Sequence, residues 1–378
     1  MIEFEEIALG GGKLTLTTFA DKSGSKSVQL SYTQSRGNPL ELICFWALPP
    51  GIVVEELSMG GIGTPWSTPR FPGSIPILVA SDIEGRFGHN CPSCDQYWRS
   101  GPHPNNCPYC GIFAASFQFL SKSQLRYVQV YCQKWEEAYF ADAGSEHVID
   151  LDEIAEATLR GIKKPDFYIS EQRQQTLLRC ASCGEFNDIL GRFGHCSNCY
   201  TRNDFAVLRD EIVPSIRNDL NAGHPPARCL QHAVSSFETI LKNYFRRLGE
   251  EVHLIPERLD RLTKKNFRNW DAINSMLAEN FGFKVKEVFE ETEWQKCQQL
   301  FQRRHVYEHN GGIVDQEYID LTGDTSVRVG QLISETPHDV HMLLSAITKF
   351  VKVVHTGFHV LLPVKTDVIE AYQSRRQT

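Results

Sequence analysis

Short apolar runs, separated by Gly, Pro and polar residues, dominate the first part of the chain. Such runs are typical of strands, and they predict β-strands over residues 14–19, 27–33, 40–48 and 75–80. Gly10-Gly11-Gly12 is predicted to be a turn, because no Lys-Ser or Lys-Thr pair follows it as a phosphate-binding loop requires. We therefore expect a β-rich region over residues 1–80, to which the sequence assigns no function.

Further along the chain, apolar positions recur every three or four residues, which is the period of an amphipathic helix. Ser121 and Asp150 are the predicted N-caps of two helices that end near Phe140 and Arg160. Pro214 is a candidate for a kink in the helical region that follows. There we expect an up-and-down bundle with one long excursion, with helices over residues 205–221, 226–249, 266–279, 292–309 and 337–360.

The helix predicted over residues 292–309 carries histidines on its apolar stripe. Thr292 is its predicted N-cap, and Asn310-Gly311-Gly312 is its predicted stop, because Asn and Gly tolerate the left-handed conformation. His309 then lies in the last turn, next to the negative end of the helix dipole, which suits a group that takes and gives a proton. The stripe consists of Trp294, Cys297, Phe301, His305 and His309.

Eight of the twelve cysteines fall into Cys-x-x-Cys units. Two sets share one arrangement, in which twelve residues separate the two units of the set. Four thiolates at this spacing predict a tetrahedral Zn²⁺ site in a zinc ribbon, with iron in the same cage as the alternative. We expect two structural, fully coordinated sites in a reducing compartment rather than a disulfide scaffold. The predicted ligands are Cys91, Cys94, Cys107 and Cys110 in the first site and Cys180, Cys183, Cys196 and Cys199 in the second.

The pentapeptide Gly-Arg-Phe-Gly-His occurs twice, over residues 85–89 and 191–195. The first copy precedes the first unit of its cysteine set and the second copy precedes the second unit, so this is no in-register duplication. A turn that feeds a metal knuckle is the favoured interpretation, and a shared ligand-binding role is the alternative. His89 and His195 are expected beside the metal sites or at the surface, because four cysteines already complete each set. For the ribbons themselves, a structural or partner-docking role is favoured over direct contact with nucleic acid.

Composition narrows the class of protein. A chain of 378 residues is long enough for two or three domains with cores of their own. The formal net charge of -7 argues against a protein that coats nucleic acid non-specifically, although it leaves room for a local basic patch. Neither a signal peptide nor an apolar run long enough to span a bilayer is recognisable, so we expect a cytoplasmic protein without membrane association.

These patterns predict a multidomain α+β protein. Small zinc ribbons have little core of their own, so the metal is expected to supply much of their folding free energy. The expected parts are a β-rich N-terminal region (1–80), a first zinc ribbon (81–120), a helical linker region (121–170), a second zinc ribbon (171–203) and a helical domain (204–378).

The last turns of the histidine-bearing helix read Arg304-His305-x-x-x-His309. Together with the preceding Arg303, the following His-Asn-Gly-Gly and the Ile-Val-Asp-x-x-Tyr tail over residues 313–318, this pattern resembles the HEPN superfamily (higher eukaryotes and prokaryotes nucleotide-binding domain). The active members of that family are metal-independent endoribonucleases. The resemblance implies an all-α HEPN-like bundle for the C-terminal region.

The resemblance also implies a substrate, a reaction and an assembly. The substrate is RNA, whose 2′-hydroxyl attacks the adjacent phosphate to leave 2′,3′-cyclic phosphate ends without a bound metal. His309 acts as general base or acid, Arg304 stabilises the phosphorane-like transition state, and His305 orients the substrate or assists proton transfer. HEPN nucleases work as homodimers with facing motifs. Family analogy further implies phage defence or a toxin-like stress response, with a regulatory protein partner.

One geometric question and three rival interpretations stay open. Arg304 and His309 are five residues apart, about 140° around a regular helix, so either Arg304 reaches around the helix or its partner histidine comes from a second copy. Residues 305–309 also read His-x-x-Glu-His, the pattern of an inverted zinc protease, which needs a further acidic ligand downstream. The other rivals are a non-catalytic HEPN-like module that binds RNA or a protein partner, and buried histidines without a function.

Overall fold

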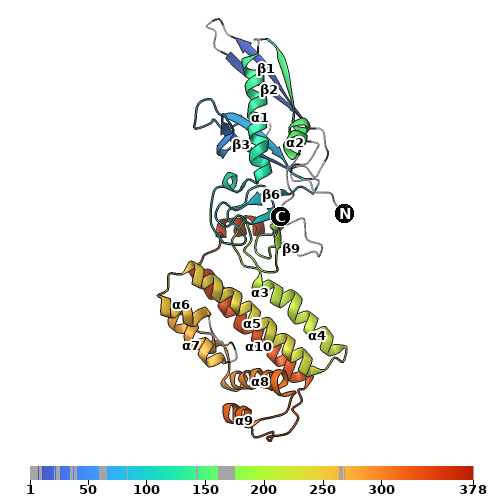
Figure 1. Cartoon of the computed structure of the whole chain (residues 1–378), viewed down its shortest axis with the longest axis vertical. Helices are drawn as coiled ribbons and strands as arrows, with labels where there is room; N and C mark the ends of the chain where they lie inside the picture. The colour runs from blue at the N-terminus through green and yellow to red at the C-terminus, as the bar shows by residue number, and fades with distance from the viewer. Residues whose placement is uncertain are drawn as a thin grey trace. The chain divides into compact units, whose positions relative to one another are not determined.

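A computed structural model of the chain divides it into two compact units (Figure 1). Residues 1–201 together with 365–378 form the first, which we call the ribbon unit, and residues 202–364 form the second, the helical unit. Sheets in the ribbon unit and helices in the helical unit confirm a mixed α+β protein. The residues that the structure describes are 7, 11–20, 22, 26–34, 37, 41–58, 66–82, 84–141, 144–160, 175–263, 267 and 269–377.

Two three-stranded antiparallel sheets form the N-terminal part of the ribbon unit. Their strand orders are β2-β1-β8 and β4-β3-β5. β4 (Ile52–Glu56) and β8 (Glu146–Asp150) were not predicted, because their runs of consecutive apolar residues are short, covering residues 52–54 and 148–149. The four predicted strands are confirmed as β1 (Lys13–Ala20), β2 (Lys26–Thr33), β3 (Leu42–Leu48) and β5 (Ile75–Ala80).

Two predicted helices pack beside these sheets (Figure 1). α1 (Lys122–Phe140) begins after Ser121, whose hydroxyl accepts from the backbone N–H of Gln124 at 3.2 Å. α2 (Leu151–Leu159) begins after Asp150, whose carboxylate accepts from the N–H of Asp152 at 3.0 Å. Both caps are as predicted, since Ser and Asp satisfy N–H groups that the first helical turn leaves free.

The segment between the two ribbons belongs to the core of the N-terminal sheets. α1 buries Tyr127 and Tyr131 in the same hydrophobic cluster as Phe45 of β3. β8 pairs with β1 in antiparallel register, with Leu14 opposite Ile149. Residues 121–160, which the sequence suggested as part of a linker region, therefore complete the N-terminal fold.

The two cysteine-rich segments share one four-stranded sheet with the order β6-β7-β10-β9. Its strands are β6 (Phe87–Asn90), β7 (Tyr97–Ser100), β9 (Gln175–Arg179) and β10 (Phe186–Leu190). β7 and β10 join the two hairpins, with Asn187 opposite Ser100 and Asp188 opposite Arg99. A 3₁₀ turn, η1 (Ser116–Phe119), leads from this sheet to α1. The two ribbons are thus halves of one structure rather than separate modules.

The helical unit is built around two long helices, α5 (Pro226–Glu251) and α10 (Pro337–Leu361), which lie side by side (Figure 1) and run in the same direction, with Phe237 against Phe350 and Tyr244 against Phe358. Aromatic rings fill the core between them and α8, with Phe237 of α5 in edge contact with Phe301 and Phe350. The remaining elements are α3 (Asp204–Val207), the π-helical turn η3 (Leu208–Ile212), α4 (Val213–Asn221), α6 (Pro256–Thr263), α7 (Trp270–Phe281), the 3₁₀ turn η4 (Lys286–Val288), α8 (Glu291–Asn310) and α9 (Gln316–Thr322).

Two boundary details differ from the sequence prediction, and a third agrees with it. Instead of a simple kink at Pro214, the preceding turn widens to the π-helical η3, because proline lacks an N–H and its ring crowds the carbonyl one turn earlier. The predicted N-cap Thr292 is wrong, since α8 already begins at Glu291 after Glu290 and has no side-chain cap. The predicted stop is confirmed, because Gly311 adopts a left-handed conformation with φ 62°.

The last helix, α11 (Thr366–Gln377), returns to the ribbon unit. Its side chains Val368, Ile369 and Tyr372 pack against the second set of cysteines. The backbone N–H of Lys365 donates to the carbonyl oxygen of Cys199 at 3.0 Å. The sequence placed these residues with the C-terminal helical domain, whereas the structure makes the helical unit an insertion between Thr201 and Lys365.

Membrane spans are absent from the helices of the described chain, since none combines the length and the apolar character needed to cross a bilayer.

Candidate functional site

Each predicted set of four cysteines converges on one point. Within each set the sulfur atoms all lie within 4.8 Å of one another. In the first set Cys91 Sγ is 3.5 Å from Cys110 Sγ, and Cys94 Sγ is 3.8 Å from Cys107 Sγ. A tetrahedral zinc ion with Zn–S bonds of about 2.3 Å sets its sulfur atoms about 3.8 Å apart. The sulfurs are too far apart for disulfides, so the geometry fits metal coordination.

The second set, Cys180, Cys183, Cys196 and Cys199, has the same geometry. The sulfur atoms of Cys180 and Cys199 are 3.5 Å apart, as are those of Cys183 and Cys196. The amide of Asn187 donates to Cys196 Sγ at 3.6 Å, which supports negative charge on that sulfur. Both four-cysteine sets are therefore compatible with zinc.

Backbone donors surround the ligands of the first site. The N–H groups of Ser93 and Cys94 donate to Cys91 Sγ at 3.4 and 3.5 Å. Those of Tyr109 and Cys110 donate to Cys107 Sγ at 3.3 and 3.5 Å. Such N–H···S bonds stabilise thiolates, and a Cys-x-x-Cys turn supplies them from its own backbone.

The repeated Gly-Arg-Phe-Gly-His pentapeptide has a structural place in both copies. Its first glycine has a positive φ in each case, 76° at Gly85 and 83° at Gly191, which only glycine adopts readily. Its histidine is buried in each case, with His89 Nε2 3.0 Å from the carbonyl oxygen of Gly101 and His195 Nδ1 3.2 Å from that of Tyr200. Burial lowers the pKa of His89 to about 3, so its ring is neutral. The two histidines support the ribbons from inside and are not members of the metal-ligand clusters.

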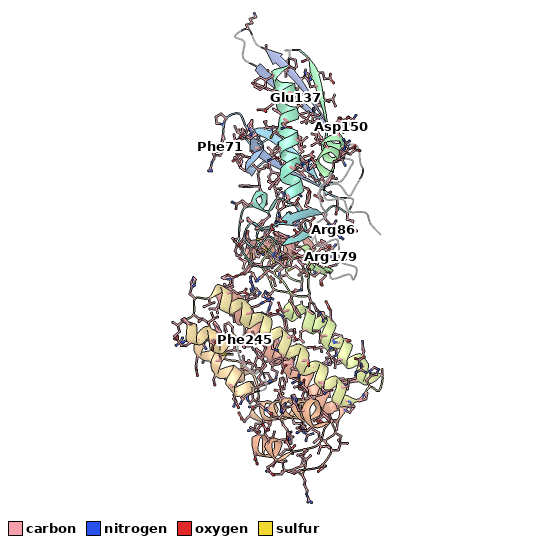
Figure 2. The ribbon with its side chains drawn as sticks, viewed as in Figure 1. Phe71, Arg86, Glu137, Asp150, Arg179 and Phe245 are labelled. Carbon is pink, nitrogen blue, oxygen red and sulfur yellow. The ribbon has the colours of Figure 1, made fainter. Side chains whose placement is uncertain are left out.

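A cleft of 670 Å³ lies in the ribbon unit between the shared sheet and α11. Arg86 and Arg179, both labelled in Figure 2, line it. The Arg86 guanidinium lies 3.9 Å from the centre of the Phe186 ring and pairs with Glu84 at 2.5 Å. Because further acidic side chains accompany the arginines, the lining has no dominant sign of charge.

The HEPN-like motif lies at the C-terminal end of α8. The inner stripe of this helix is fully buried at Trp294, Cys297 and Phe301 and then leaves the core. His305 is half-buried, and the side chain of His309 is 50% exposed. The two rings have centroids 4.4 Å apart. The stripe therefore carries the histidines out of the aromatic core to the surface, where a ligand has access to His309.

Glu308 connects the predicted catalytic residues. Its Oε2 atom lies 2.6 Å from Arg304 Nη1 and 3.6 Å from His309 Nε2. Glu238 of α5 approaches Arg304 from the other side, with Oε2 3.9 Å from Nη2. Within one chain, the Arg304 guanidinium and the His309 imidazole thus both contact the same carboxylate oxygen.

No protein-family model, curated protein or solved structure matches this chain. The site is therefore defined by the geometry of its own residues.

Sequence reasoning did not anticipate the buried polar cluster around Arg303. Its guanidinium donates to Asp324 at 2.9 Å, to Glu335 at 3.3 Å and to the Tyr318 hydroxyl at 3.0 Å. Burial and the hydrogen bond to Asp324 raise the pKa of the Tyr318 hydroxyl to about 12. A signal was present in the sequence, because Arg303 follows Leu300 by three residues and precedes Val306 by three, which places it on the inner face.

The same cluster holds the long excursion between α8 and α10. Desolvation works against the ionised carboxyl of Asp324, but hydrogen bonds from Ser326, Tyr318 and Arg303 outweigh it and hold its pKa well below the usual range. At Glu335 burial dominates and raises the pKa, although Arg303 opposes it. Arg303 of α8 thereby forms ion pairs with both halves of the segment between α8 and α10, through Asp324 and Glu335.

A third metal ligand does not accompany His305 and His309. Over the part of the chain that the structure describes, the groups of three or more ligating side chains are the two cysteine sets. Glu308, the base in the zinc-protease interpretation, is engaged by Arg304. Glu308 had no role in the HEPN-like interpretation and is the residue of this site that the family pattern missed.

Proposed function

We propose that the helical unit is a metal-independent endoribonuclease of HEPN type, and that the end of α8 is its active site. The observation that supports this is the convergence of Arg304 and His309 on one oxygen atom, 2.6 and 3.6 Å away. A phosphoryl oxygen at that position would contact a permanent cation and an imidazole together. Such a pair can supply the proton transfer and the charge stabilisation that phosphoryl transfer needs without a metal.

In the proposed reaction the ribose 2′-oxygen forms a bond to the adjacent phosphorus while the bond from phosphorus to the 5′-oxygen breaks. His309 takes the 2′-hydroxyl proton or returns a proton to the leaving 5′-oxygen, and Arg304 stabilises the added negative charge on the phosphoryl oxygens. His305, whose ring centroid is 4.4 Å from that of His309, orients the substrate or relays the proton. The products carry 2′,3′-cyclic phosphate and 5′-hydroxyl ends.

The assembly and biological setting follow from the same proposal. A homodimer would bring two copies of the exposed His309 together and form a composite site. A free ribonuclease endangers its own cell, so control by a regulatory partner in phage defence or a toxin-like stress response fits this activity. The zinc ribbons, whose ligand sets fit Zn²⁺, would serve as a rigid scaffold for that partner.

The test is cleavage of single-stranded RNA without divalent metal. We expect the zinc-loaded protein to produce 2′,3′-cyclic phosphate ends in excess EDTA, and His309→Ala and Arg304→Ala to lower the rate at least about 100-fold. His338→Ala is the matched control, because His338 is an exposed histidine of the same unit and lies outside the motif. Circular dichroism on the chelated sample shows whether the ribbons stay folded. Full activity of both motif variants would refute the assignment.

A non-catalytic module that binds RNA or a protein partner is the second candidate. The observation that favours it is the engagement of Arg304 by two carboxylates, which leaves the guanidinium without free charge for a transition state. This candidate predicts RNA or protein binding with no cleavage of RNA by any variant. The inverted zinc protease has no comparable support, since the described residues supply no third ligand beside His305 and His309.

A further inference from the structure

The carboxylate of Glu308 occupies the position at which a substrate phosphate would meet the site. Its Oε2 atom alone contacts both Arg304 and His309, at 2.6 and 3.6 Å. A carboxylate resembles a phosphate in presenting two negative oxygens to a guanidinium fork. An RNA phosphate and Glu308 therefore compete for the same donors.

Local charge strengthens this competition. Arg304 has a carboxylate on each side, Glu308 of its own helix at 2.6 Å and Glu238 of α5 at 3.9 Å. Two negative charges around one positive charge repel a further anion at short range. In this arrangement Arg304 offers an approaching phosphate no net attraction.

The two carboxylates differ in their freedom to move. The Glu238 side chain is 15% exposed and comes from a neighbouring helix, whereas the Glu308 side chain is 42% exposed and lies in the last turn of α8. An exposed glutamate changes rotamer at little cost, but a covered one is held by its surroundings. We therefore expect an RNA phosphate to replace Glu308 at Arg304, while the contact between Arg304 and Glu238 is kept.

We propose that Glu308 is an internal competitor of the RNA phosphate, which closes the site until substrate displaces it from Arg304. This inference rests on the proposed function for the identity of the ligand. It adds that the resting site is inhibited by its own helix and that the affinity for RNA is reduced by the need to break the Arg304–Glu308 pair.

The experiment measures binding of a 2′-O-methyl single-stranded RNA, which lacks the attacking hydroxyl and is not cleaved. We expect Glu308→Gln to bind it about tenfold more tightly than the natural protein. Release of Arg304 adds about one phosphate contact, so the slope of log affinity against log salt should steepen by about 0.7. Glu308→Asp, which keeps the charge but shortens the reach, should give an intermediate affinity.

The control is Glu317→Gln, which removes the same charge from an exposed glutamate of the same unit. Its effect measures the general change in charge. In an Arg304→Ala background, Glu308→Gln should change the affinity for RNA no more than Glu317→Gln does. Without the Arg304 guanidinium, Glu308 and the RNA phosphate no longer compete for the same donor. Affinity of Glu308→Gln equal to or below that of Glu317→Gln would overturn the inference, and so would absence of RNA binding in every variant.

Cleavage of unmodified RNA by the same variants separates the inference from the proposed function. Tighter binding by Glu308→Gln without cleavage by any variant would uphold the competitor and refute the nuclease. Cleavage by the natural protein that depends on His309, together with unchanged or weaker binding by Glu308→Gln, would uphold the nuclease and refute the competitor.

Discussion

Arg303 is buried beneath the excursion, where it contacts Asp324, Glu335 and Tyr318. Arg304, its neighbour in sequence, contacts Glu238 and Glu308, and its side chain is 12% exposed. The 100° step between consecutive helical residues directs the two guanidinium groups to different carboxylates, although both side chains are largely covered, at 8% and 12% exposure. The paired arginines therefore differ in their partners, since Arg303 contacts the excursion and Arg304 contacts the glutamate next to the exposed His309.

Arg303→Ala should lower the free energy of unfolding by about 3 kcal/mol or more, because it leaves the buried carboxylates of Asp324 and Glu335 without their cation. Urea unfolding followed by circular dichroism measures this. Arg328→Ala, at an exposed arginine of the same excursion, should change the value by less than about 0.5 kcal/mol. Equal effects of the two substitutions would contradict a structural role for the Arg303 cluster.

Buried His355 of α10 makes the stability of the folded protein depend on pH. Burial and then the nearby positive groups His359, Arg202 and Arg209 lower its pKa from 6.5 to about 3. The folded-state pKa lies below the unfolded value, so the unfolded chain binds more protons between these values. The stability that the neutral ring contributes is therefore present above pH 6.5 and is lost as the pH falls toward 3.

When the pH falls from 7 to 5, protonation of His355 should lower the free energy of unfolding of the natural protein by about 1 kcal/mol. This value is smaller than the full pKa shift implies, because solvent partly screens the ring. His355→Gln should remove that part of the pH dependence, while its amide keeps a partner for the hydroxyl of Tyr244. Urea titrations of both proteins at the two pH values give the comparison. An identical loss in both would show that His355 is already protonated or is exposed in the folded state.

At the level of elements, α11 packs against the second set of cysteines, whose geometry fits a zinc ion. Its residues Val368, Ile369 and Tyr372 pack on the sulfur cluster, and Lys365 bonds to the carbonyl oxygen of Cys199. A ribbon gains folding free energy from its metal, so loss of the ion removes the surface on which the helix rests. A short terminal helix without tertiary contacts is only marginally stable in water.

Cys183→Ser should therefore release α11, and hydrogen exchange over residues 366–377 should accelerate at least about tenfold. Cys110→Ser, which removes a ligand of the first site, is the control and should affect this segment less, because no residue of α11 packs in the cluster around that site. Similar exchange in both variants would mean that the shared sheet, rather than the second site, holds the helix.

For the whole molecule, local patterns in the sequence identified most elements and both ligand sets. They did so because helical periodicity, cap residues and Cys-x-x-Cys spacing act over a few residues. The β1–β8 pairing, the β7–β10 junction and the return of α11 to Cys199 join residues far apart in the chain. The Glu238 contact to Arg304 is of the same kind. Contacts between residues far apart in the chain produce no periodic pattern in the sequence. The sequence therefore suggested two separate ribbons and a self-contained C-terminal domain.

The insertion of the helical unit has a consequence for synthesis of the protein. A ribosome completes both cysteine sets and then all of residues 202–364 before it makes α11. The surface of the second cysteine set consequently stays uncovered until the helical unit has been translated and the chain has returned to Cys199. A ribbon unit with α11 packed on the second cysteine set therefore occurs only in chains whose helical unit has been fully translated.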